Sequence, residues 1–365
     1  MAIYIMKPWY KKAAPSSGGI YGAEWDGSST TLWTRTDDAV GLANPNPYYL
    51  NMSGTPSSPF DDIMPWSGMV VSEDAEAGTV VSIPKFYYKL TQNSSTMGLK
   101  IQISMTQEDG FVCSPAHMDR GDGKGKRDVV YVGRYHCGST NYKSVTGVTP
   151  MANVTRPNFR TAIHNLGSTI WMMDFATRFT IWLLYLVEYA NWDSQTCIGY
   201  GCGNNSAAQA MGYTDSMPYH TGTTQSSRTT YGLGTQYRHI EGLWDNVYDW
   251  IDGCYYDSNG LNIILNPANF SDSSGGIAVG VPTIGYPSQF TLKEVNGTYP
   301  LIIPTASSGS ESTFSCDYWG FNASSPCLYV GGDYSQYLNL GLFYVSRSRA
   351  TSASAYLGSR FLKLP

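Results

Sequence analysis

The chain has 365 residues, 42% of them apolar and only 14% charged, and its formal net charge is −5. An apolar fraction of this size can bury a core, so we expect a folded globular protein. The weak negative charge gives no electrostatic footprint for nucleic acid or for an anionic membrane surface, and it argues against both partners. The counts of Gly (38), Tyr (28) and Trp (10) are typical of a fold rich in loops and aromatic side chains.

The first sixty residues are rich in Gly, Ser, Pro and Asn, notably over residues 15–19 and 44–47. This composition is typical of loops and turns. We therefore predict that residues 1–60 form an attachment and oligomerisation segment and that residues 61–365 form the main domain. Residues 1–12 contain no apolar stretch of signal-peptide length, so we expect the protein to fold in a cytoplasm.

Periodic patterns begin in the second segment. Short apolar runs at residues 69–71 and 80–88 are rich in β-branched and aromatic side chains, which predicts strands. Residues 158–165 have helical periodicity. Asp174 is a suitable N-cap for a second, stronger helix, in which apolar side chains recur at three- and four-residue spacing. Charged residues divide this helix too often for a membrane span, which needs about 20 apolar residues.

The chain after residue 199 is a long run of Gly, Ser, Thr, Tyr and Asn with few apolar interruptions. Long loops in a compact domain are usually functional or held by tertiary contacts. Together with two helices and several short strands, they predict an α+β architecture in which helices and loops surround small sheets.

Residues 331–364 show two interleaved layers. Turn glycines and apolar or inward-facing residues form a predicted scaffold: Gly331, Gly332, Gly341, Phe343, Val345, Ala350, Leu357, Gly358, Arg360 and Leu362. The positions between them are mostly Tyr, Ser, Arg, Asp and Asn. In a strand over residues 342–348, alternation places Phe343 and Val345 on one face and leaves the other face free to be polar.

This tract resembles the variable region of proteins that diversity-generating retroelements target, a group that includes phage tropism determinants. Upstream, the stretches IPKFYYK (83–89), GRYHCG (133–138), RPNFRTAIHNLG (156–167) and GLWDNVYDWIDG (242–253) resemble phage proteins with the C-type lectin-like fold. That fold is shared with formylglycine-generating enzyme. The resemblance implies an α+β fold of this branch, with small antiparallel sheets, two helices, long loops and a variable region at residues 331–361.

The resemblance also implies which positions are diversified and bind ligand. These are Asp333, Tyr334, Ser335, Gln336, Tyr337, Asn339, Tyr344, Ser346, Arg347, Ser348, Arg349, Ala353, Ala355 and Tyr356. Their chemistry agrees with recognition, because Tyr supplies rigid contact area, Ser adaptable hydrogen bonds and Arg anchoring contacts. The alternative is an ordinary sheet edge with solvated polar residues.

The function implied by the resemblance is receptor binding by a phage. We expect a homotrimer in the virion tail, made in the bacterial cytoplasm, that binds a host surface receptor, protein or glycan, beside other tail proteins. The seven cysteines contain no CxxC pair, which suits reduced thiols. The alternative is a bacterial surface-displayed or static lectin-like adhesin.

Metal and catalytic sites are the remaining possibilities. The carboxylates Glu241, Asp245, Asp249 and Asp252 could gather around a calcium ion, but a tryptophan-rich core with capping acids is the stronger interpretation. Formylglycine-generating enzyme is a copper-dependent oxidase that uses paired cysteines in its C-terminal segment. Residues 331–365 contain no cysteine, so we predict no enzyme activity, no catalytic residue, no metal and no cofactor.

Overall fold

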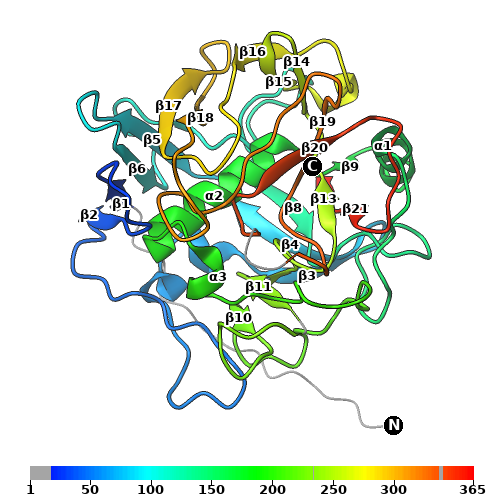
Figure 1. Ribbon diagram of the computed structural model, residues 1–365, viewed down its shortest axis with the longest axis horizontal. Coiled ribbons are helices and arrows are strands. Elements are labelled where there is room, and N and C mark those ends of the chain that lie inside the picture. The colour runs from blue at the N-terminus through cyan, green and yellow to red at the C-terminus, as the bar shows by residue number, and fades with distance from the viewer. Residues whose placement is uncertain (1–17, 233, 337–339) are drawn as a thin grey trace.

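The computed structural model describes residues 18–232, 234–336 and 340–365. One buried helix, α2 (Phe175–Tyr189), crosses the middle of the molecule, and small sheets surround it (Figure 1). The other helices are short: α1 (Arg156–His164), α3 (Ser194–Cys197) and three 3-10 turns, η1 (Pro59–Asp62), η2 (Trp66–Gly68) and η3 (Pro267–Asn269).

Two five-stranded sheets form the larger part of the first half of the chain. In spatial order, the first contains β2 (Thr34–Asp37), β1 (Ile20–Trp25), β6 (Leu99–Ser104), β5 (Tyr87–Gln92) and β7 (Val112–Cys113). The second contains β3 (Val71–Asp74), β4 (Gly78–Pro84), β8 (Val129–Gly133), β22 (Phe361–Lys363) and β9 (Ile170–Met172). The end of the chain is therefore tied into a sheet of the N-terminal half.

Four smaller sheets come from the second half. One contains β20 (Val345–Ser348), β19 (Cys327–Val330), β13 (Tyr248–Trp250) and β21 (Leu357–Ser359), in that order. Another contains β10 (Gly222–Thr223), β11 (Thr235–Tyr237) and β12 (Ile240–Glu241). The last two contain β14 (Cys254–Asp257), β15 (Gly260–Ile263) and β16 (Ile277–Gly280), and β17 (Gln289–Glu294) with β18 (Pro300–Ala306).

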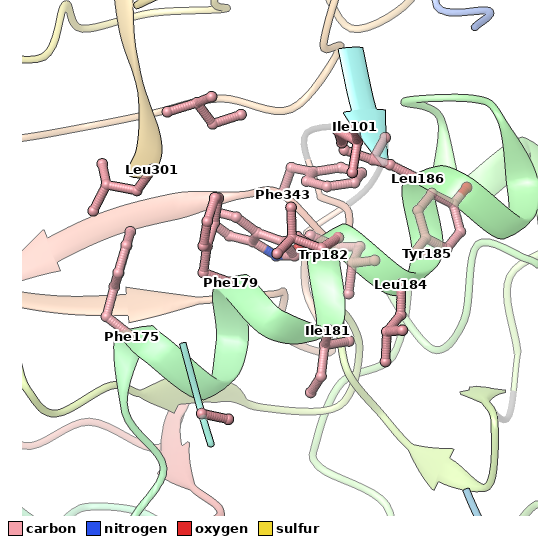
Figure 2. Packing of buried hydrophobic residues seen from close by; sticks show 14 of the residues in the cluster. Ile101, Phe175, Phe179, Ile181, Trp182, Leu184, Tyr185, Leu186, Leu301 and Phe343 are labelled. Atoms are coloured by element: carbon pink, nitrogen blue, oxygen red, sulfur yellow. The ribbon is translucent and has the colours of Figure 1, made fainter. Parts of the chain in front are cut away.

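The helix predicted to begin at Asp174 is confirmed. The Asp174 carboxylate accepts a hydrogen bond from the backbone N–H of Thr177 at 2.8 Å, which is the N-cap geometry. Every residue of α2 is buried. Figure 2 shows Phe179 and Trp182 of α2 packed in the core with Phe343 from the C-terminal tract. The helix thus joins the tract to the rest of the molecule.

The predicted α+β fold of the C-type lectin-like class is wrong. In the described ranges the structure is β-rich, built of small, mostly antiparallel sheets, and α2 is the one helix longer than nine residues. The physical reason lies after residue 199, where long loops were predicted. Much of that stretch pairs into strands of two to seven residues, which are too short for alternation to be visible in a polar sequence.

The hydrophobic core does not divide at residue 60. Strand β1 pairs with β6 over six residues, and Trp25 and Phe60 are fully buried in the same cluster as α2. Residues 20–60 therefore share one core with the later chain. An attachment role for residues 1–60 stays a prediction, and residues 1–17 lie outside the described part of the chain. Among the described helices, none is both long and apolar enough to cross a membrane.

Candidate functional site

Three separated segments of the predicted variable tract come together at one cavity. Residues 333–336 follow β19, residues 344–348 comprise β20 and the residue before it, and residues 353–356 precede β21. The cavity has a volume of about 460 Å³, and we call it the tyrosine cavity. Its lining consists of Tyr248, Tyr329, Asp333, Ser335, Gln336, Tyr344, Ser348, Ser354, Tyr356 and Leu357.

Tyrosine rings from three strands or their ends form the floor. Tyr248 of β13 lies 4.6 Å from Tyr329 of β19 and 5.6 Å from Tyr344, measured between ring centroids. The strand register explains the contact between Tyr248 and Tyr329, because Tyr329 stands opposite Trp250 in the antiparallel β13–β19 pair and Tyr248 lies on the same face of β13 as Trp250. Burial raises the pKa of Tyr344 to about 12, so its hydroxyl stays protonated at neutral pH.

Asp333 is the charged group of the cavity. Only 2% of the residue is exposed, and the backbone N–H and the hydroxyl of Ser335 both donate to one carboxylate oxygen, at 2.6 and 2.7 Å. Burial raises the pKa of Asp333, and the hydrogen bonds from Ser335 oppose that rise. The other described lining side chains are neutral tyrosine, serine, glutamine and leucine.

The predicted ligand-binding positions differ in exposure. Those at the surface are Arg349, Ala353, Ala355 and Tyr356, and those half-buried are Ser335, Gln336, Arg347 and Ser348. The buried ones are Asp333, Tyr334, Tyr344 and Ser346. Tyr337 and Asn339 lie outside the described residues. Buried members line or support the cavity, as where Tyr334 packs on Tyr356 at 5.0 Å between ring centroids.

Sequence reasoning missed Tyr248 and Tyr329. Both lie outside the tract, and Tyr329 precedes the glycine pair at its start by two positions. The available signal was alternation, since Tyr248 and Trp250 share one face of the short strand β13. That signal does not identify the partner strand, so the floor of the cavity could not be assembled from the sequence.

The four carboxylates near the GLWDNVYDWIDG stretch do not converge on one point. Glu241 accepts from the backbone N–H groups of Gly212 and Thr214, at 2.7 and 2.9 Å. Asp252 accepts two hydrogen bonds from Arg160. In the described ranges, no group of three or more His, Cys, Asp or Glu side chains is placed to hold a metal ion. Glu241 and Asp252 instead hold local elements in place.

The burial of the Asp245 carboxylate predicts that the stability of the protein depends on pH. The threonine Thr235 donates to this carboxylate through both its backbone N–H and its hydroxyl, at 2.7 and 2.9 Å. Burial nevertheless raises the pKa of Asp245 from 3.8 to about 6. A raised pKa contributes stability that is complete below the unfolded-state pKa near 4 and is lost as pH rises through 6.

We therefore expect Asp245→Asn to gain stability relative to the parent protein, by about 2 to 3 kcal/mol, as the pH rises from 4 to 8. Urea unfolding at a series of pH values measures this difference. Leu50→Ala, at an exposed side chain that does not titrate, is the control and should show a difference that does not change with pH. A constant difference for Asp245→Asn as well would contradict the assignment.

A second cavity, of about 630 Å³, lies between η1 and the β11–β12 turn. It is lined by Ser57, Ser58, Asp61, Asp62, Trp66, Ser67, Met69, Val70, Tyr219, His220, Arg238 and His239. Both ring nitrogens of His220 are engaged, one with Thr221 at 2.8 Å and one with Asp61 at 2.9 Å. None of the predicted ligand-binding positions lines this cavity. Its polar groups form an ion-pair network that links η1 to α2.

Comparison with known proteins gives little further information. No family model matches the chain, and no curated protein matches it. Among solved structures, PvdO from Pseudomonas aeruginosa is similar over 81% of this chain and 98% of that chain, with 9% sequence identity and a TM-score of 0.36. This is a distant relationship of fold alone.

Proposed function

We propose that the protein is a receptor-binding protein and that residues 331–361 form its ligand-binding surface. The observation that carries this proposal is the convergence of three segments of that tract on the tyrosine cavity. The cavity combines aromatic walls with a few polar groups, which is the usual composition of a ligand site. Its floor belongs to short β-strands, so the side chains around it are presented by a fixed backbone.

The separation of scaffold and surface within the tract supports this proposal. Phe343, Val345 and Leu357 are buried, whereas Arg349 and Tyr356 are exposed. Glycine is required at residue 331, where φ is +85° and a Cβ atom would lie 2.5 Å from the carbonyl oxygen of Leu243. Substitutions at the exposed positions would therefore leave the supporting backbone unchanged, as a diversified surface requires.

We further propose that the chain is a variable protein of a diversity-generating retroelement, carried as a homotrimer in a phage tail and made in the bacterial cytoplasm. The partner is then a protein or glycan on the host surface, beside other tail proteins. Sequencing the gene and its surroundings tests this. We expect a near-identical repeat that differs from codons 331–361 only at adenines, next to a reverse transcriptase gene. A neighbourhood without such a repeat would contradict diversification but not receptor binding.

Binding, and not catalysis, is the activity that we propose for the cavity. Its described lining includes the hydroxyls of Ser335, Ser348 and Ser354. The carboxylate of Asp333, which accepts from the hydroxyl of Ser335, is a weaker base than the histidine or lysine that usually activates a serine nucleophile. Neither residue type is found among the described lining residues, and the sequence places none in residues 331–361.

Substitution of the exposed positions tests the binding surface. We expect the double variant Arg349→Ala/Tyr356→Ala to lose at least tenfold in affinity for host cells, because arginine and tyrosine dominate binding energies at interfaces. Its stability should change by no more than about 0.5 kcal/mol per site, since both side chains are exposed. Binding of the labelled protein to cells and urea unfolding measure the two quantities.

The control is the double variant Leu50→Ala/Lys124→Ala, which removes an exposed apolar and an exposed basic side chain outside the tract. It should bind cells as the parent protein does. If this control loses binding and the Arg349/Tyr356 variant does not, the receptor site lies elsewhere on the molecule.

A further inference from the structure

The tyrosine cavity contains a negatively charged side chain and no positively charged one among its described lining residues. Asp333 is buried in its wall, and it forms no ion pair with any lysine or arginine of the described residues. Arg347 and Arg349, the two neighbours of the lining residue Ser348 in the sequence, do not line the cavity, and Arg349 is exposed. The Arg347 guanidinium instead lies beside Gly320 and donates to the hydroxyl of Ser346 at 3.4 Å. A buried carboxylate without a cationic partner is costly, and a positively charged ligand would offset that cost.

The aromatic floor of the tyrosine cavity also favours a positively charged ligand. The faces of tyrosine rings carry negative electrostatic potential and attract cations within about 6 Å of the ring centre. Tyr248, Tyr329 and Tyr344 form one contact cluster, and Tyr356 stands at the rim. Hydroxyl oxygens from serine and tyrosine add acceptors for N–H donors. Ring faces, hydroxyl oxygens and one carboxylate together favour a cationic group and disfavour an anionic one.

We propose that the tyrosine cavity binds an ammonium or guanidinium group, namely the end of a lysine or arginine side chain on a protein receptor. This inference rests on the proposed receptor-binding function and names the ligand class for the same site. The volume of about 460 Å³ fits one long side chain.

Small probes test the charge requirement directly. With the full chain, we expect Nα-acetyl-lysine methylamide to bind with a dissociation constant on the order of 1 mM, as measured by saturation-transfer NMR or calorimetry. The norleucine analogue has the same shape without the charge and should bind at least tenfold more weakly. Methyl glycosides of common sugars should not bind. Equal binding of lysine and norleucine probes, or binding of a glycoside in place of the lysine probe, would overturn the proposal.

Two variants locate the probe. Asp333→Asn keeps the shape of the side chain and an oxygen that can accept from Ser335, and it should weaken lysine binding at least tenfold. Ser348→Lys leaves Asp333 intact and places a positive charge at the half-buried rim, which should weaken binding by a similar factor. Ser348→Gln adds length without charge and is the matched control. Unchanged lysine binding in both charge variants would show that the probe sits elsewhere.

The outcomes separate this inference from the function on which it rests. If no lysine probe binds but Arg349→Ala/Tyr356→Ala abolishes binding to cells, the cation proposal fails and receptor binding stands. If the lysine probe binds as described but that variant leaves cell binding unchanged, the receptor-binding proposal fails at this surface. Thermal melting of each variant confirms that the fold is retained before any loss of binding is assigned to the cavity.

Discussion

Replacing Arg360 with methionine is expected to lower the free energy of unfolding by about 3 to 5 kcal/mol. Arg360 lies between β21 and β22 and is fully buried. Its guanidinium donates to the backbone carbonyls of Gly133, Arg134 and Glu241, at 2.7, 2.8 and 2.6 Å. Methionine fills a similar volume but leaves these buried acceptors without donors, and each unsatisfied group costs about 1 to 3 kcal/mol. Urea unfolding followed by circular dichroism measures the loss.

The control for this substitution is Arg349→Met in the same tract. Arg349 is exposed, so its replacement should change the unfolding free energy by no more than about 0.5 kcal/mol. The pair of variants separates the scaffold layer of the tract from its surface layer. A loss below 1 kcal/mol for Arg360→Met would mean that the last strand does not depend on this side chain for its place in the sheet.

The elements that the sequence predicted well are those specified by local patterns. The helix α2 was predicted because its aromatic and aliphatic residues repeat with helical spacing and Asp174 caps its first turn. By contrast, β1 pairs with β6 across more than seventy residues of chain, and nothing local in the Gly-rich N-terminal stretch indicates that partner. The core therefore includes residues that composition alone had placed in a separate segment.

In the candidate site, too, local patterns were predicted correctly and the pairing of distant strands was not. Alternation in the predicted strand placed Tyr344 and Ser348 on one face, and both line the tyrosine cavity. The rest of the lining depends on β13 pairing with β21 in parallel and with β19 antiparallel. These strands have three or four residues, too few for a register to be inferred from sequence. Tyr248 and Tyr329 could therefore not be assigned to the site.

Burial of charge was also invisible in the sequence. Glu188 lies on α2 among apolar residues, and its spacing gave no reason to expect a partner. In the structure it is fully buried and pairs with Arg238, which occupies the first position of the two-residue turn between β11 and β12. Arg238 adopts φ +46°, and the next residue, His239, adopts φ +71°. Such turns usually contain Asn or Gly, so the ion pair stabilises a turn that the local sequence disfavours.

Glu188→Gln is accordingly expected to lower the free energy of unfolding by up to about 3 kcal/mol, because it removes the buried countercharge of Arg238 and leaves the guanidinium with Asp61, at 3.0 Å, as its remaining carboxylate partner among the described residues. Glu188 also accepts from the hydroxyls of Ser58, at 2.7 Å, and Tyr237, at 3.0 Å, so the change affects η1, α2 and β11 together. Replacing both charges, with Arg238→Met added, should recover at least about 1 kcal/mol relative to Glu188→Gln alone, since the buried guanidinium is then gone and Asp61 keeps its hydrogen bonds to Tyr219 and His220. Urea unfolding of the parent, the two single variants and the double variant gives the coupling energy.

The control cycle uses the surface pair Lys85 and Asp128, whose aspartate side chain is 89% exposed, and should give a coupling no larger than about 1 kcal/mol. Additive losses at Glu188 and Arg238 would show that the two side chains stabilise the fold independently, and the strained turn would then need another explanation.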